Sequence, residues 1–158
     1  MVSFRNIPND DLEIPPNSVV RHDGYFRLPR AARIVSFQPH MHMRGKALML
    51  EAIHPDGRSE VVSYADRFDF NWHNNYVYTD DAAPVLPKGT ILHVTAWHDN
   101  SAANKNNPDP TQWVGSGSRS IDEMLHLWVN ITYLTEEDYQ QTVAERKKAA
   151  ASASGQQQ

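Results

Sequence analysis

Residues 47–64, Ala-Leu-Met-Leu-Glu-Ala-Ile-His-Pro-Asp-Gly-Arg-Ser-Glu-Val-Val-Ser-Tyr, contain two short apolar runs separated by a turn sequence. In Pro55-Asp56-Gly57 the proline presets one backbone dihedral, the aspartate can hydrogen-bond locally, and the glycine accepts a positive φ. The runs on either side, 47–54 and 59–64, therefore predict the two arms of a β-hairpin.

Short runs bounded by turn residues recur on both sides of this hairpin. The other candidate strands are residues 21–28, 32–37, 75–79, 90–100 and 124–134. Proline and glycine separate many of these runs, and the runs do not follow the helical period. The pattern predicts an all-β fold, an antiparallel jelly roll or β-sandwich, over residues 19–134.

The two ends of the chain differ from this pattern. Residues 1–18 are polar and proline-rich, which predicts an extended arm. The sequence Thr-Glu-Glu-Asp at 135–138 indicates a helix start, because an N-cap residue precedes acids in the first turn. We expect a helix over 135–150 and a flexible tail over 151–158.

The composition limits the chemistry that the chain can perform. Its 158 residues, 40% hydrophobic and 22% charged, predict one globular domain. A net charge of -4 gives no basic field for nucleic acid, and no apolar run approaches the length of a membrane span. Cysteine is absent, which excludes disulfides, zinc–thiolate sites, iron–sulfur clusters and cysteine nucleophiles. A soft metal ligand must therefore be a methionine.

The segment after the 32–37 run carries the candidate chemistry. It reads Gln-Pro-His-Met-His-Met-Arg-Gly-Lys over residues 38–46. If the strand continues, side chains alternate between its faces, so His40 and His42 point the same way. Their imidazoles could then meet on one copper, zinc, iron or nickel ion. A surface His-x-His pair at a strand end explains the same spacing, so the motif needs a third ligand.

Met124 is the candidate third ligand, since it begins the last expected strand after a long loop over 101–120. A thioether is a weak ligand that favours copper, and Cu(I) in particular. Two imidazoles and one thioether would leave an open position for a small molecule such as dioxygen. The alternative is that Met124 fills a gap in the core, as methionine often does.

Five segments resemble the C-terminal catalytic domain of the copper type II, ascorbate-dependent monooxygenases, and most closely its bacterial members. They follow the order of that family, at 39–46, 68–72, 86–90, 98–101 with 107–110, and 122–124. The family includes the peptidylglycine and dopamine enzymes. The resemblance implies a jelly-roll sandwich in which His40, His42 and Met124 hold one copper ion. It also implies hydroxylation of a substrate C–H bond with dioxygen and an external reductant such as ascorbate.

The chain also departs from this family. It has no His-His pair for the second, electron-supplying copper, which implies a second copper domain or a redox protein as partner. Gln38, His126 and Trp128 stand where the peptidylglycine enzymes carry the Arg, Asn and Tyr that clamp a peptide carboxylate. A peptide ending in glycine is therefore not the expected substrate. The disulfides of the animal enzymes are missing, which fits a bacterial-type member.

Other polar residues are candidates for supporting roles around the metal. His98, Asn71 and His126 could hydrogen-bond the ligands. His98 also fits an alternative copper ligand or a hydrogen-bonded histidine that anchors the long loop. Residues 71–73 could wall the site or form an aromatic core turn. Arg44, a lone charge beside a glycine, is expected at the surface.

Three functions stay open on the sequence alone. The chain could be a copper monooxygenase domain or subunit, a copper-binding module without turnover, or a structural sandwich in a larger assembly. In the last case the N-terminal arm and the C-terminal helix would dock onto other parts of the assembly. The first residues lack a signal-peptide pattern, so the chain is either cytoplasmic or given without a leader. The family resemblance implies a periplasmic or secreted location.

Overall fold

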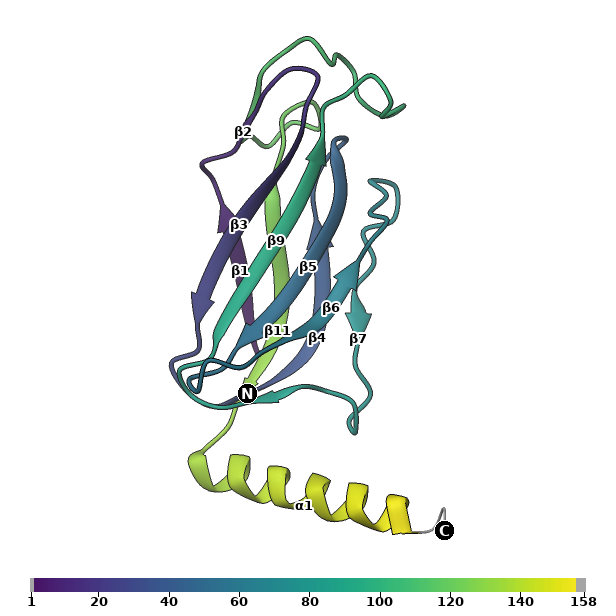
Figure 1. The fold of residues 1–158 in the computed structure, drawn as a ribbon. Helices are drawn as coiled ribbons and strands as arrows, with labels where there is room; N and C mark the ends of the chain where they lie inside the picture. Colours follow the sequence, from purple (N-terminus) through teal and green to yellow (C-terminus); the bar gives the residue numbers. More distant parts are fainter. Residues whose placement is uncertain (1, 156–158) are drawn as a thin grey trace.

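Two antiparallel sheets and one C-terminal helix make up the protein in a computed structural model that describes residues 2–155, with side chains described for 7–152 (Figure 1). The first sheet contains β1 (Val2–Asn9), β11 (Leu125–Tyr133), β4 (Ala32–His40) and β7 (Tyr76–Val77), and β8 (Val85–Leu86) also pairs with β4. The second sheet contains β3 (Val19–Arg27), β9 (Ile91–Asp99), β5 (Gly45–Ile53) and β6 (Ser59–Ala65). A small separate pair consists of β2 (Glu13–Ile14) and β10 (Val114–Gly115).

The strand pairing is that of a jelly roll. β1 pairs with β11, β3 with β9, β4 with β7, and β5 with β6, so the first half of the chain pairs with the second half as one long hairpin. Successive pairs alternate between the two sheets, which rolls this hairpin into a sandwich. The prediction of an all-β, antiparallel jelly roll is confirmed.

The two sheets bury their facing sides. In β11 the odd-numbered residues from Leu125 to Ile131 are buried, and in β9 Leu92, Val94 and Ala96 are buried in the same core. Side chains alternate across a strand, so the even-numbered residues of β11 lie on the outer face of the first sheet. His126 is one of these residues, and its partner His40 on β4 shares that face.

The predicted hairpin is formed by β5 and β6. Asp56 accepts a hydrogen bond from the backbone N–H of Arg58 at 3.0 Å, as expected for a turn aspartate. Gly57 has a φ of 87°, and a Cβ at this position would meet nothing within 4 Å. The left-handed backbone conformation, and not crowding, is therefore the reason for a glycine here.

The structure corrects the N-terminal arm predicted over 1–18. Residues 2–9 form β1, which pairs along its whole length with β11. Without β1, the edge of β11 would present unpaired backbone donors and acceptors, and an extended segment satisfies them. The sandwich therefore includes these residues, and they are not a free docking arm.

The C-terminal helix α1 (Glu136–Gly155) is longer than the predicted 135–150. The Thr135 hydroxyl accepts a hydrogen bond from the backbone N–H of Asp138 at 3.1 Å, which confirms the predicted N-cap. Five residues of the predicted flexible tail, 151–155, are helical, while 156–158 lie outside the described residues.

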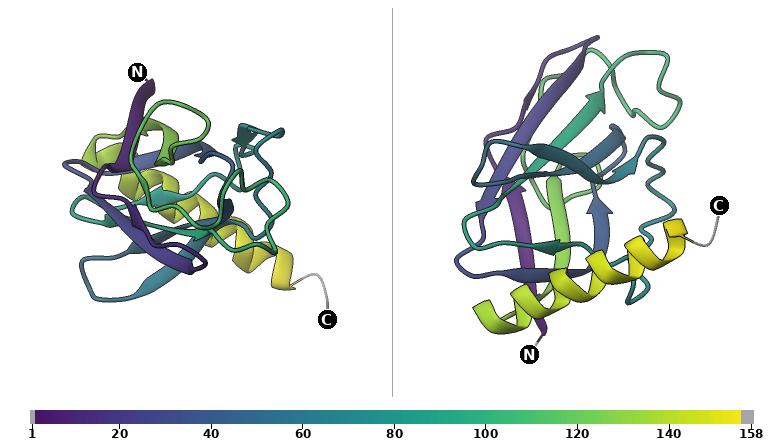
Figure 2. Two further views of the ribbon diagram at one scale, coloured as in Figure 1. Left: turned by 90° about the horizontal axis from the view of Figure 1, so that it is seen from above. Right: turned by 60° about the horizontal axis from the view of Figure 1, so that its bottom comes forward.

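The helix crosses one end of the sandwich and makes few contacts with it (Figure 2). Arg146 attaches it by donating hydrogen bonds to the carbonyls of Ala83 at 2.7 Å and Asp80 at 2.9 Å. Within residues 2–155 no helix has the length and apolar character that crossing a membrane requires.

Polar groups cover the outer face of the second sheet around Asp23. Its Oδ1 atom accepts hydrogen bonds from the side chains of Arg21 at 2.7 Å, His93 at 2.6 Å and Thr95 at 3.0 Å. Burial acts to raise the pKa of Asp23, but these donors outweigh burial and hold the pKa below its ordinary value of 3.8. The other ring nitrogen of His93 lies 3.1 Å from Glu51 Oε2.

Asp23→Asn is expected to lower the free energy of unfolding at pH 7 by roughly 1–2 kcal/mol, because it removes a charged acceptor. A lowered folded-state pKa stabilises the protein above the ordinary pKa, and this stabilisation is lost as the pH falls through the folded-state pKa. Urea unfolding from pH 7 to pH 2.5 should therefore show that the free energies of unfolding of the wild type and the variant converge in acid. If the difference between the two free energies stayed constant over this pH range, it would contradict a stabilising role for the ionised Asp23 carboxylate.

Candidate metal centre

The candidate ligands lie at one end of the outer face of the first sheet. His40 ends β4, and strand register places it opposite His126 of β11. The ring centres of His40 and His42 are 5.6 Å apart. A metal–nitrogen distance of about 2 Å puts two imidazole centres on one ion roughly 4–6 Å apart. The structure thus brings the two predicted histidines within the range that a shared ion requires.

Further aromatic rings surround His40. The ring of His73 is centred 4.7 Å from it and that of His126 6.2 Å from it. The indole of Trp128 stacks on His40 with ring centres 4.6 Å apart and planes 18° apart. The sequence pointed to His73 only as part of a possible wall. The remaining signal for it was its place directly after the 68–72 segment.

Backbone carbonyls determine the tautomers of His42 and His73. A carbonyl can only accept, so His42 Nδ1, 3.1 Å from the carbonyl of Asp122, carries a hydrogen. By the same reasoning His73 Nε2 donates to the carbonyl of Met41 at 3.2 Å. The lone pair of each ring, where it has one, is then on the other nitrogen. Histidines that bind metals are typically oriented by a bond of this kind.

His40 is also suited to binding a metal ion. Burial lowers its pKa to about 4, and the neighbouring His73, His42 and His126 add to this shift, so the ring is neutral at pH 7. Its Nδ1 atom is buried and has no hydrogen-bond partner among the described residues. An unsatisfied buried polar atom costs about 1–3 kcal/mol, and a metal bound at this nitrogen would satisfy it.

Glu123 holds together the two segments that carry the predicted ligands. The side chain is fully buried, and Oε1 accepts the backbone N–H groups of His42 at 2.5 Å and Met124 at 3.3 Å. Oε2 accepts that of Arg44 at 2.9 Å. Burial raises the pKa of Glu123 to about 7, while these three donors act in the opposite direction. The sequence placed Glu123 in a matched segment but did not indicate this role.

Met124 is positioned through its backbone. Its N–H donates to Glu123, and its carbonyl accepts a hydrogen bond from His98 Nε2 at 3.1 Å. The pairing of β4 with β11 ends at the His40–His126 pair, two residues after Met124. His98 therefore supports the segment of the third predicted ligand, at the end of the long loop.

Histidine and acidic residues alone do not form a ready metal site. In residues 2–155 no group of three or more His, Asp or Glu side chains is arranged to hold a metal ion. The predicted set has two imidazoles and one thioether, so it is not a group of that kind. Its donors are a neutral His40, a tautomer-fixed His42 and a methionine, a set that suits copper.

The surroundings of Arg44 and Asn71 differ from those that the sequence predicted. Arg44, expected at the surface, is only 2% exposed, because Asn100 Oδ1 and the carbonyl of Ile121 each accept its side-chain hydrogens at 2.9 Å. Asn71 is exposed, and its amide donates to Asp69 in the same loop at 3.0 Å. The supporting role expected for Asn71 is therefore not observed.

Gly45 allows the loop over 66–75 to pack against the His-x-His segment. A Cβ at Gly45 would lie 2.6 Å from Met41 Cβ and 2.8 Å from the Phe68 ring. Phe68 in turn stacks on His73, with ring centres 5.5 Å apart. The absence of a side chain at Gly45 thus lets Phe68, and with it His73, approach the metal centre.

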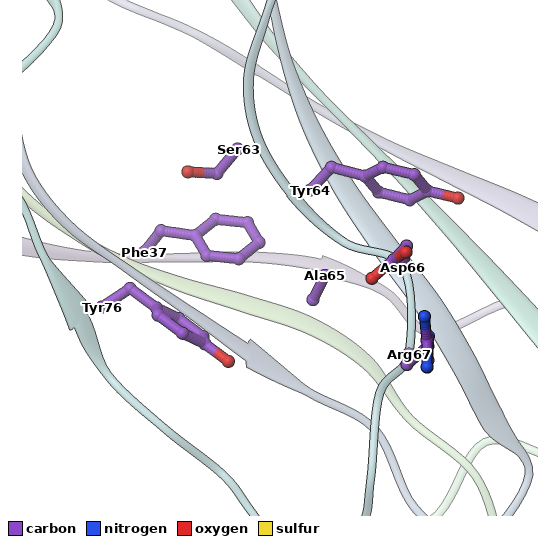
Figure 3. A pocket seen from close by; sticks show the side chains of 7 residues that line it. All are labelled: Phe37, Ser63, Tyr64, Ala65, Asp66, Arg67 and Tyr76. Atoms are coloured by element: carbon purple, nitrogen blue, oxygen red, sulfur yellow. The ribbon is translucent and has the colours of Figure 1, made fainter.

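A hollow of about 240 Å³ opens at the edge of the sandwich between β6 and β7 (Figure 3). It is lined by Phe37, Ser63, Tyr64, Ala65, Asp66, Arg67 and Tyr76. A second hollow of about 230 Å³ shares Ala65, Arg67 and Tyr76 with it and reaches Pro39, the residue before His40. None of the three candidate ligands, His40, His42 and Met124, lines either hollow.

Comparisons with known proteins add little to this picture. No protein-family model and no curated protein matches the chain. Among solved structures, those of infectious bursal disease virus strains Gt and Gx match with TM-scores of 0.33 at 12% and 14% identity. They cover 84% and 86% of this chain, which spans about a third (33%) of each viral chain. Likeness at this level carries no argument about function or assembly.

Proposed function

We propose that the chain is the copper-binding catalytic domain of a dioxygen-using monooxygenase, with His40, His42 and Met124 as ligands. The observation that carries the proposal is the closeness of two rings, 5.6 Å apart: a partly buried, neutral His40 and a His42 whose Nδ1 donates to the Asp122 carbonyl. The family resemblance of the sequence supplies the choice of copper and the third ligand. The same resemblance suggests a periplasmic or secreted location.

The residues of the chain would position the ion and shield it. The Asp122 carbonyl holds the His42 ring, and Glu123 fastens the backbones of His42 and Met124 to each other. Trp128 covers one face of the His40 ring. A bound copper ion would supply the one-electron redox chemistry for hydroxylating a C–H bond with dioxygen. The electrons would come from an external reductant such as ascorbate, through a second copper domain or a redox protein.

A copper-binding module without turnover is the second candidate. The absence of a His-His pair for an electron-supplying copper favours it, since the chain alone would lack a route for the second electron. Both candidates use the same ligands and differ only in whether the bound copper turns over a substrate.

Metal analysis of protein purified under copper-replete conditions is the first test. Both candidates require about one copper ion per chain, and protein without copper would overturn both. Dioxygen consumption by the copper-loaded protein, with a reductant and a C–H substrate, then distinguishes them. If no turnover occurs even when electrons are supplied, the monooxygenase proposal fails and the binding module stands.

Met124→Ala is expected to weaken Cu(I) binding roughly 10–100-fold, because a soft ligand is lost. Met43→Ala, three residues after His40, should leave the affinity unchanged. Met41 is a poorer control because its side chain is fully buried in the core, where truncation costs about 2–5 kcal/mol. Competition with a Cu(I) chelator measures the effect, and equal losses at positions 124 and 43 would remove Met124 from the site.

A further inference from the structure

We infer that the hollow beside Arg44 binds a small organic carboxylate, whose charge pairs with the guanidinium of Arg44. The hollow has a volume of about 270 Å³ and is lined by Arg44 and by residues from the stretch 108–122. None of the candidate copper ligands lines it, so the inference goes beyond the proposed function and does not depend on it.

The first support is that Arg44 is a buried cation without a close carboxylate. Among the side chains of residues 7–152 it is the only buried lysine or arginine, and it is 2% exposed. Its guanidinium donates to two neutral oxygens, Asn100 Oδ1 and the Ile121 carbonyl. Within 4 Å it forms no ion pair with any described residue. Buried charges are normally paired, because removing an ion from water is costly. The arrangement therefore indicates a counter-ion from outside the chain.

The carboxylates around Arg44 do not take this role. Glu123, Asp109 and Asp122 act on its charge from beyond 4 Å. Glu123 accepts backbone N–H groups, Asp122 is paired with Arg119 at 2.7 Å, and Asp109 accepts hydrogen bonds within its own loop. Burial lowers the pKa of Arg44, and these three charges only partly offset that effect.

The second support is that the guanidinium has hydrogens left to donate. An arginine carries five N–H hydrogens, and Arg44 uses two of them in its bonds to Asn100 and Ile121. Its Nη2 has no hydrogen-bond partner among the described residues, yet it is not one of the fully buried polar atoms that lack a partner. This nitrogen therefore keeps some contact with solvent. Because Arg44 lines the hollow, we place that contact there.

The remaining wall of the hollow indicates the class of ligand. Trp113, Val114 and Ile121 are apolar, and Trp113 and Ile121 are 65% and 50% exposed, so a ligand with an apolar body would cover them. Asp109 and Asp122 also line the hollow, and their charges disfavour a dianion such as phosphate. A planar carboxylate suits the guanidinium geometry. Pockets for drug-sized molecules measure about 300–1,000 Å³, so a smaller monocarboxylate fits here.

The hollow adjoins the candidate metal centre without including it. Asp122 lines the hollow, and its backbone carbonyl accepts the hydrogen bond from His42 Nδ1. A carboxylate in the hollow would contact the segment that orients His42, and it would not need a bound ion. Binding should therefore be the same before and after metal is removed from the protein.

Nuclear magnetic resonance of the full chain during titration with benzoate tests the inference. Benzamide, which has the same ring without the charge, and inorganic phosphate are the comparison probes. We expect benzoate to bind at least roughly 10-fold more tightly than either, because only benzoate combines a carboxylate with an apolar body. The indole N–H signal of Trp113, assigned by its absence in Trp113→Phe, should shift. The signal of Trp97, on β9 of the second sheet, should not.

Variants of two arginines locate the charge that binds. Arg44→Gln should lower benzoate affinity roughly 10–100-fold and leave benzamide unaffected, because a charge-assisted hydrogen bond is lost. Arg44→Lys keeps the charge without the planar fork, so its affinity should fall between those of the wild type and Arg44→Gln. Arg67→Gln is the matched control, since Arg67 lines the hollows near β6 and β7, and it should bind benzoate as the wild type does.

The wild type alone can overturn the inference, so the test does not require the Arg44 variants to fold. Equal binding of benzoate and benzamide, or an unshifted Trp113 signal, would do so. Loss of binding in Arg67→Gln would move the site to another hollow, and loss of binding on metal removal would assign the carboxylate to a bound ion. Either result would also overturn it. Metal analysis decides the proposed function separately, and protein without copper would leave this inference standing.

Discussion

Replacing Glu123 by alanine is expected to lower the free energy of unfolding by about 3–5 kcal/mol, as for the loss of one partner from a buried charged network. The backbone N–H groups of His42, Arg44 and Met124 would lose their carboxylate acceptor. Each buried donor left without a partner costs about 1–3 kcal/mol. The buried guanidinium of Arg44 would also lose a neighbouring negative charge. Urea unfolding at pH 7 measures the change.

Two control variants make this result specific. Glu123→Gln keeps the shape and one acceptor oxygen, so we expect about half the loss. Glu145→Ala removes an exposed acidic side chain of α1 that accepts a hydrogen bond from Gln141, and pairs four residues apart on a helix contribute about 0.2–0.5 kcal/mol. A loss below about 1 kcal/mol for Glu123→Ala would show that the carboxylate does not hold these segments together.

His42→Ala is expected to lower copper affinity by at least ~100-fold, more than the loss of a residue that only supports a ligand. The reason is the orientation of its ring, since Nδ1 donates to the Asp122 carbonyl and leaves Nε2 to bind. Titration with copper against a competing chelator, for both oxidation states, measures the effect. We expect the protein to stay folded, because His42 lies beyond the end of β4 and outside its strand pairing with β11.

His54→Ala is the matched control for this experiment. His42 and His54 are 5% and 7% exposed, so both substitutions remove a buried histidine. His54 lies at the β5–β6 turn, where its Nε2 is 2.7 Å from Glu60 Oε1. We expect copper binding to be unchanged in His54→Ala. Similar losses in both variants would indicate a general effect of truncating histidines and not a ligand at position 42.

Local sequence features were sufficient to predict most of the strands. Runs expected at 21–28 and 47–54 correspond to β3 (Val19–Arg27) and β5 (Gly45–Ile53). Alternation and turn chemistry act over a few residues, so they can be read without knowing the partners. β1 was not recognised because a polar, proline-containing segment becomes a strand only beside the free edge of β11.

In the candidate site, too, some features could be predicted from the local sequence and others depended on distant residues. The sequence predicted that His40 and His42 lie close together, and their ring centres are 5.6 Å apart, but β4 ends at His40, so strand alternation is not what places both rings. The inward turn of Arg44 depends on acceptors at Asn100 and Ile121, which are distant in the sequence. The sequence therefore suggested a lone surface charge where the fold provides a buried guanidinium hydrogen-bonded to Asn100 and Ile121.

By itself the sequence determined an antiparallel β fold, a closely spaced histidine pair, and the absence of thiolate chemistry, because these follow from composition and local patterns of residues. Only the tertiary structure decided what surrounds that pair. Glu123 reaches His42 across 81 residues of sequence, and His73 reaches Met41 across 32. Such contacts depend on how the two halves of the jelly roll pair, and no local pattern of residues encodes them.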